Sequence, residues 1–246
     1  MYLHYPPNME RPTPAYILEV MIDAYRQQLQ FDPETEPDIV LTMNTTVAEW
    51  RVACDLGGWK RIGKSLNAAF RIDCSEKEWK QVLTPPKMTT LQDVCELVAR
   101  YAERPRIRPA RLFGATCQTA GAFLTVRSLL HEAGAEVRAL RPSSALAPYT
   151  RKHPDVFLGS ISELAPGKLP LVDIENLLLR RVGQLLILNW LVVGVSWTLG
   201  YTVLAERASL VAGLVLFCLC LAAQREPSRV DFGELKTFRD LVEVLV

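Results

Sequence analysis

The chain has few of the residues from which most catalytic sites are built. It contains three histidines and six cysteines among 246 residues. No Cys-x-x-Cys pair, Gly-x-Ser-x-Gly, His-Glu-x-x-His or glycine-rich phosphate-binding motif occurs in it. The sequence therefore offers no zinc site, no recognisable activated nucleophile and no phosphate cradle, and we expect no enzymatic activity, no metal and no cofactor.

An excess of charge of one sign is also missing. The chain has 28 Lys and Arg residues against 27 Asp and Glu residues, which gives a formal net charge of +1 at pH 7. Such a balance creates no field strong enough to gather polyanions. We therefore expect no nucleic acid among the partners.

Charge and proline are absent together from one long part of the chain. The residues from Val182 to Ala205 and from Ala208 to Gln224 are uncharged and are separated only by Glu206 and Arg207. As helices they would be about 36 Å and about 26 Å long, against a hydrocarbon core of about 30 Å. The pattern predicts a two-helix transmembrane hairpin over residues 181–225, with spans at 182–205 and 208–224.

The alternative is a buried helical hairpin in a soluble domain, but both segments are apolar around the whole helix circumference. Basic residues flank the hairpin, so the positive-inside rule places both termini in the cytoplasm. The expected localisation is that of a multi-pass integral protein of the plasma or inner membrane, with the lipid bilayer as a partner. Small residues four apart are expected to pack the two helices together; they are Ser196, Gly200, Ser209 and Gly213.

Caps and apolar periodicity predict a mainly α fold, with small helical bundles beside the hairpin. Helices are expected over 16–29, 59–70, 76–83, 91–101 and 119–133, and the prolines from Pro142 to Pro170 keep any helix between them short. The expected organisation is a flexible leader (1–14), a helical bundle (15–103), a basic linker (104–117), a second helical and loop region (118–180), the hairpin (181–225) and a C-terminal helix (226–246).

Two segments of the chain match in residue class. Both Thr90–Val98 and Thr237–Leu245 read threonine, apolar, polar, aspartate, apolar, any, glutamate, apolar, apolar. Any capped amphipathic helix can give this pattern, so the match is consistent either with an internal repeat or with two independent helices. If it is a repeat, the predicted hairpin is an insertion within the second copy.

The segment before the first of these helices resembles acyl carrier proteins. An Asp-Leu-Gly turn, a Phe-x-Ile step and a threonine-capped helix with an early aspartate follow one another in the order seen in that family. These landmarks are Asp55-Leu56-Gly57, Phe70-Arg71-Ile72, and Thr90 with Asp93 and Val94. The resemblance implies a four-helix bundle. It covers about 60 residues well and a similar length in a weaker second copy.

The chain departs from that family at the residue that carries its chemistry. The family needs a serine at the start of its long helix to accept phosphopantetheine, and here Trp59 and Lys60 stand in that place. We therefore expect a degenerate carrier-like fold without a prosthetic group. Trp59, Lys60 and Arg61 are the candidate interaction residues, because this position resembles the surface that carrier proteins present to their partners.

Arginines concentrate in the predicted linker. Arg104, Arg106, Arg108 and Arg111 lie within eight residues that also contain two prolines. The simple interpretation is a solvated linker. If the domain is tethered to a membrane, the same arginines are candidate contacts with the anionic lipid surface.

These observations lead to a functional hypothesis with two alternatives. The leading one is a non-enzymatic, membrane-anchored interaction or adaptor module with a protein partner of unknown identity. The alternatives are a functional acyl or peptidyl carrier with an unconventional phosphopantetheine site, and an accessory subunit of a membrane protein complex.

Overall fold

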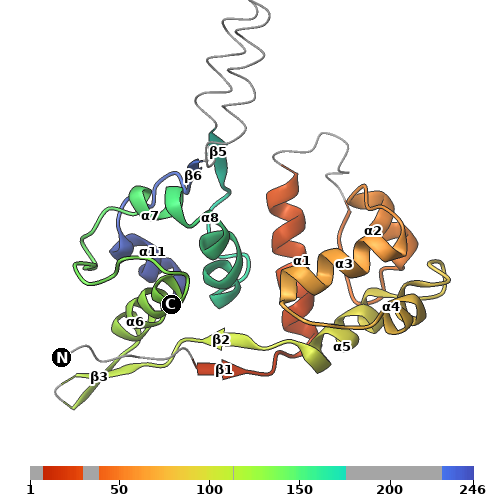
Figure 1. Ribbon diagram of the computed structural model, residues 1–246, viewed down its shortest axis with the longest axis horizontal. Helices are drawn as coiled ribbons and strands as arrows, with labels where there is room; N and C mark the ends of the chain where they lie inside the picture. The colour runs from red at the N-terminus through yellow and green to blue at the C-terminus, as the bar shows by residue number, and fades with distance from the viewer. Residues whose placement is uncertain (1–7, 30–38, 113, 176–228) are drawn as a thin grey trace, which may run out of the picture.

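The computed structural model describes residues 8–29, 39–112, 114–175 and 229–246. They form two helical halves that lie next to each other (Figure 1). The first half contains α1 (Pro14–Gln28), α2 (Val47–Ala53), α3 (Trp59–Phe70), α4 (Glu76–Leu83) and α5 (Leu91–Tyr101). The second half contains α6 (Gln118–Glu132), α7 (Ala147–Lys152), α8 (Pro154–Val156), the π-helix η1 (Phe157–Ile161), the 3-10 helix η2 (Ser162–Leu164) and α11 (Phe238–Leu245).

Three short antiparallel strand pairs accompany the helices. They are β1 (Asn8–Glu10) with β2 (Arg104–Arg106), β3 (Ala110–Leu112) with β4 (Ala115–Cys117), and β5 (Asp173–Glu175) with β6 (Arg229–Asp231). The first pair joins the segment before α1 to the segment that follows α5. In Figure 1 the pair extends along the lower edge of the view, from the base of α1 and α5 toward β3 and α6.

Each half has its own hydrophobic core. The buried apolar residues of the first core run in sequence from Tyr16 to Ala102, and those of the second run from Ala122 to Leu245. The two cores share no residue. Separate cores are the mark of separate structural units, whose contact surface is expected to be more polar than their interiors.

The two halves repeat one local arrangement. In the first half, Leu91 N–H at the start of α5 donates to the main-chain oxygen of Thr45 at 2.9 Å. In the second half, Phe238 N–H at the start of α11 donates to the main-chain oxygen of Ser144 at 3.2 Å. Single β-bridges occupy the matching positions, and they link Thr46 to Thr90 and Ala145 to Thr237.

The caps of these two helices match as well. Thr90 N–H donates to Asp93 Oδ2 at 2.8 Å, and Thr237 N–H donates to Asp240 Oδ2 at 2.8 Å. Each helix packs against the first helix of its half, α5 on α1 and α11 on α6. The two similar sequence segments thus hold equivalent positions in two similarly built halves, which is the arrangement that an internal repeat produces.

The capping carboxylates make stability depend on pH. Hydrogen bonds from Ser75 and Tyr101 lower the pKa of Glu78 to about 2. A lowered pKa adds stability that is present above the unfolded value of about 4.5 and is lost as the pH falls through the folded value. We expect urea unfolding at pH 3 to show a smaller loss of stability, relative to pH 6, in Glu78→Gln than in the unmodified protein. Equal losses in both would contradict this role of Glu78.

The structure does not support the predicted transmembrane hairpin. A span needs about 20 consecutive apolar residues, whereas the longest helices of the described residues, α1 and α6, have 15 residues each. No helix in this part of the chain is long and apolar enough to cross a membrane. The predicted spans at 182–205 and 208–224, with Ser196, Gly200, Ser209 and Gly213, lie outside the described residues. The fold class is mainly helical with short strands, and neither the hairpin nor the integral-membrane localisation is supported.

Candidate binding cleft between the two halves

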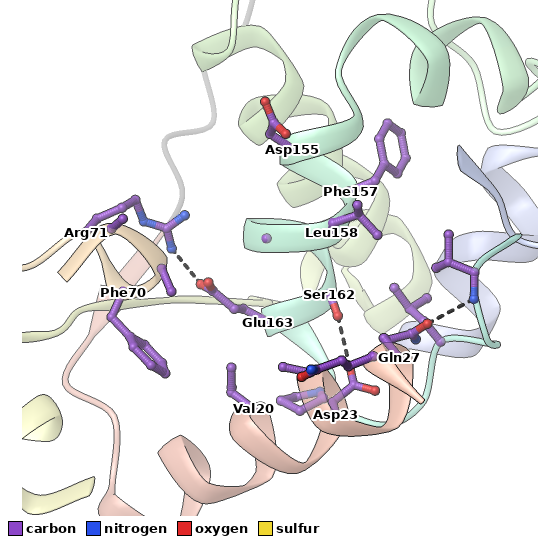
Figure 2. A pocket seen from close by; sticks show the side chains of 18 of the residues that line it. Val20, Asp23, Gln27, Phe70, Arg71, Asp155, Phe157, Leu158, Ser162 and Glu163 are labelled. Carbon is purple, nitrogen blue, oxygen red and sulfur yellow. Dashed lines mark hydrogen bonds and ion pairs between the residues drawn. The ribbon is translucent and has the colours of Figure 1, made fainter. Parts of the chain in front are cut away.

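A cleft of about 630 Å³ lies between the two halves. The first half contributes α1 and the end of α3 to its walls, and the second half contributes α8, η1 and η2 (Figure 2). Most of its lining residues are apolar, and Val20, Phe70 and Leu158 are among them. Segments that are far apart in the sequence therefore form one apolar hollow.

Polar bonds join α1 to the second half along one side of this cleft. Arg26 Nη2 donates to the main-chain oxygen of Leu169 at 2.6 Å. The main-chain N–H of Val172 donates to Gln27 Oε1 at 2.9 Å. The two hydrophobic cores share no residue, so polar bonds of this kind are an important part of the contact between the halves. We call this contact, which α1 and the end of α3 make with residues 160–172, the seam.

Two buried carboxylates lie in the seam. Asp23 of α1 is 4 % exposed and accepts hydrogen bonds from Arg26 Nη2 at 2.7 Å and from Ser162 Oγ at 3.1 Å. Glu163 of η2 is 8 % exposed and accepts one from Arg71 Nη2 at 2.6 Å. A buried carboxylate is costly unless it is paired and hydrogen-bonded, so the arginines compensate both charges.

Arg71 reaches the second half from an unusual backbone conformation. It caps the C-terminus of α3 with a φ of 55°, in the left-handed region that favours glycine and is unfavourable for other residues. Its Nη1 donates to Ser160 Oγ at 2.7 Å, in addition to the bond with Glu163. The long side chain makes contacts across the seam that a glycine in this position would not.

A second backbone irregularity faces Arg71. The wall formed by Phe157–Ile161 is a π-helix, and π-helical turns occur frequently at functional sites. Within it, Leu158 lines the cleft and is 42 % exposed. A β-carbon on Gly159 would lie 4.0 Å from Arg71 Nη1, at ordinary contact distance, so this residue packs beside the guanidinium without requiring glycine.

Burial alters the acid–base properties of the seam. It raises the pKa of Glu163, while the Arg71 guanidinium acts in the opposite direction. Burial and the Glu163 charge raise the pKa of Tyr16, whose hydroxyl donates to the main-chain oxygen of Glu163. Glu163 therefore accepts a proton more readily than an exposed glutamate, and a loss of Arg71 would increase this tendency.

The cysteines of the first half are buried, and burial makes their thiols difficult to ionise. Burial raises the pKa of Cys54 and Cys74 to about 11 and that of Cys95 to about 12. Their thiols are neutral at pH 7, and the neutral thiol is a poor nucleophile. Within the described ranges, no group of three or more His, Cys, Asp or Glu side chains is placed to hold a metal ion.

The interaction residues expected from the sequence lie away from the cleft. Trp59, Lys60 and Arg61 form the first turn of α3, and the cleft meets the other end of that helix. Lys60 Nζ lies 3.4 Å from Glu76 Oε2 and 5.5 Å from the centre of the Trp59 ring. Arg61 lines a separate hollow of about 400 Å³, together with Asp55.

Three of the four clustered arginines are bonded to the segment before α1. Arg104 and Arg106 form ion pairs with Glu10, at 2.5 Å and 3.0 Å. Arg108 donates to Asn8 Oδ1, and Arg111 is exposed in β3. Their predicted role as lipid contacts depended on a membrane tether, which the described residues do not provide.

The cleft residues were not recognised as a site from the sequence. Arg71 was noted only as the middle of the Phe-x-Ile step, and Glu163 lies among short apolar runs with no motif around it. An acidic residue at a buried position of α1, Asp23, is the one local signal that was available. The position of Asp23 does not reveal its hydrogen-bond donor Ser162, which lies 139 residues away in the chain.

Comparisons of the chain with protein-family models, with curated proteins and with solved structures gave no significant match. The resemblance to acyl carrier proteins therefore has no support beyond the few landmark residues that suggested it. That assignment is withdrawn.

Proposed function

We propose that this chain is a non-enzymatic interaction module that binds the apolar part of a partner in the cleft between its two halves. The observation that carries the proposal is the cleft itself, an apolar hollow of about 630 Å³ with a compensated ion pair, Arg71 and Glu163, at its wall. Both halves contribute residues to the cleft, so the site depends on how the two halves are placed against each other.

Size and chemistry support a binding role. Ligand sites are commonly hollows of about 300–1,000 Å³ with mostly apolar walls and a few placed polar groups. The cleft meets this description, since its mostly apolar lining also carries a smaller set of polar side chains, namely Asp23, Gln27, Gln28, Arg71, Asp155, Ser162 and Glu163. The exposed Leu158 adds apolar surface that a partner can cover.

The proposal is tested with Nile red, a neutral dye whose fluorescence rises in apolar surroundings. We expect the full chain to bind Nile red and Leu158→Asp to bind it about tenfold more weakly, because covering one leucine contributes about 1.5–3 kcal/mol. Fluorescence titration gives the affinity. Leu158 is partly exposed, so the variant is expected to fold, and circular dichroism checks this.

Met88→Asp is the matched control. Met88 is 81 % exposed, on the loop between α4 and α5, and does not line the cleft. We expect its affinity for Nile red to equal that of the unmodified chain. If Leu158→Asp binds as tightly as Met88→Asp, or if the unmodified chain does not bind the dye, the cleft is not the binding site.

A further inference from the structure

The two members of the Arg71–Glu163 pair differ in their access to solvent. The Arg71 side chain is 48 % exposed, whereas the Glu163 side chain is 10 % exposed. A group that arrives from solvent can therefore reach the guanidinium but not the carboxylate. A group that competes with Glu163 for the pair therefore binds to the arginine, and an anion competes best because its hydrogen bonds to a guanidinium are charge-assisted.

The guanidinium has donors for a second acceptor. Arg71 donates from Nη1 to Ser160 and from Nη2 to Glu163, and an arginine carries five N–H groups in a planar fork. That fork matches a carboxylate or phosphate group, with which it forms short, charge-assisted hydrogen bonds. The same side chain stands at the wall of an apolar hollow.

We propose that the cleft takes an amphiphilic organic anion, whose apolar body fills the hollow and whose anionic group draws Arg71 away from Glu163. This inference rests on the binding role proposed for the cleft and adds the class of ligand and the way that the site responds to it. Arg71 thereby acts as a latch between the halves, closed on Glu163 in the free protein and transferred to the ligand in the complex.

The transfer leaves Glu163 buried without its partner, and the carboxylate then takes up a proton from water. Binding of the anion is therefore coupled to proton uptake and becomes tighter as the pH falls. The other charged or titratable groups near Glu163 are Tyr16, Asp23 and Arg26 on α1 and Arg104 on β2, whose guanidinium lies 4.2 Å from the centre of the Tyr16 ring. The exposed Asp155, also in the cleft lining, disfavours an anion and limits its affinity.

The test uses 8-anilinonaphthalene-1-sulfonate, which joins an aromatic body to a permanent anion, alongside neutral Nile red. We expect Arg71→Gly to bind the sulfonate about tenfold more weakly, because the variant loses a charge-assisted hydrogen bond to the anion. Nile red should bind to this variant at least as well as to the unmodified chain. Glycine suits the left-handed backbone at this position, so the variant is expected to fold.

Three further variants separate the latch from a purely structural role. Arg71→Lys keeps the charge and should retain most of the sulfonate binding, and Arg239→Ala, which removes an exposed arginine of α11, should change neither dye. In the unmodified chain the sulfonate should bind more tightly at about pH 5.5 than at about pH 7.5, and Glu163→Gln should flatten this profile.

Several results would overturn the latch while leaving the cleft in place. They are equal sulfonate binding by Arg71→Gly and the unmodified chain, a parallel loss of both dyes in Arg71→Gly, and a pH profile that Glu163→Gln does not change. Failure of the cleft itself is seen separately, as an absence of the Leu158→Asp effect on Nile red.

Discussion

Replacing Gly121 by alanine is expected to destabilise the second half by about 3 kcal/mol, at the upper end of the usual cost of overpacking. A β-carbon at this position of α6 would lie 2.0 Å from the main-chain oxygen of Arg108 and 3.0 Å from Cα of Pro109. Both atoms belong to backbone, which cannot turn aside as a flexible side chain can. Helix α6 must therefore move away from the β2–β3 connection.

Gly159→Ala is the matched control, because it makes the same change in a helical segment of the same half. A β-carbon there meets nothing closer than Arg71 Nη1 at 4.0 Å, and alanine in a helix is favoured over glycine by about 0.5–1 kcal/mol. We therefore expect Gly121→Ala to lower the urea midpoint and Gly159→Ala to keep or raise it. Equal midpoints in the two variants would show that the close approach of α6 to Arg108 has no energetic importance.

Helices that carry their own local signals could be predicted from the sequence. The helices expected over 59–70 and 76–83 are α3 and α4, and a capping box of Ser75 and Glu78 opens α4. Thr90 and Thr237 likewise precede α5 and α11. In each case the capping residue and the apolar stripe lie within about a dozen residues of one another, so no distant contact is needed to recognise the element.

Elements that depend on distant partners could not be predicted. The stretch around Arg104 has the composition of a solvated linker, yet it forms β2, because Glu10 of β1 lies beside it. Three-residue strands have no periodicity to detect. The pairing of β1 with β2 also joins segments that most of the first half separates in the sequence. The prolines after residue 140 did indicate short helices there, and α7, α8, η1 and η2 are short.

The candidate site depends entirely on such distant contacts. Asp23 and Glu163 become a pair of buried carboxylates only when α1 packs against η2, and Arg71 becomes their neighbour only through the end of α3. The interaction residues expected from the resemblance to carrier proteins, Trp59, Lys60 and Arg61, lie at the other end of α3. The match between Thr90–Val98 and Thr237–Leu245 in the sequence does not show which faces of the two halves meet.

Replacing Phe157 by alanine is expected to destabilise the second half by about 3–5 kcal/mol, the usual cost of removing a buried phenylalanine. Phe157 is fully buried, and its ring centre lies 6.2 Å from that of Phe232 and 6.4 Å from that of Phe238. These rings connect the π-helix to the segment that ends in α11. The substitution leaves a cavity where three parts of the second core meet, and Phe157→Leu, which retains most of the volume, should cost less than half as much.

The same variant tests whether the halves are independent. The first core contains no residue of the second, so hydrogen exchange in Phe157→Ala should accelerate in α6 and α11 while α5 keeps its protection. Because Leu158 of the cleft wall belongs to the destabilised second half, the affinity of this variant for Nile red should also fall. If α5 loses protection to the same extent as α11, the seam of Arg26, Arg71 and their carboxylates couples the two halves into a single cooperative unit.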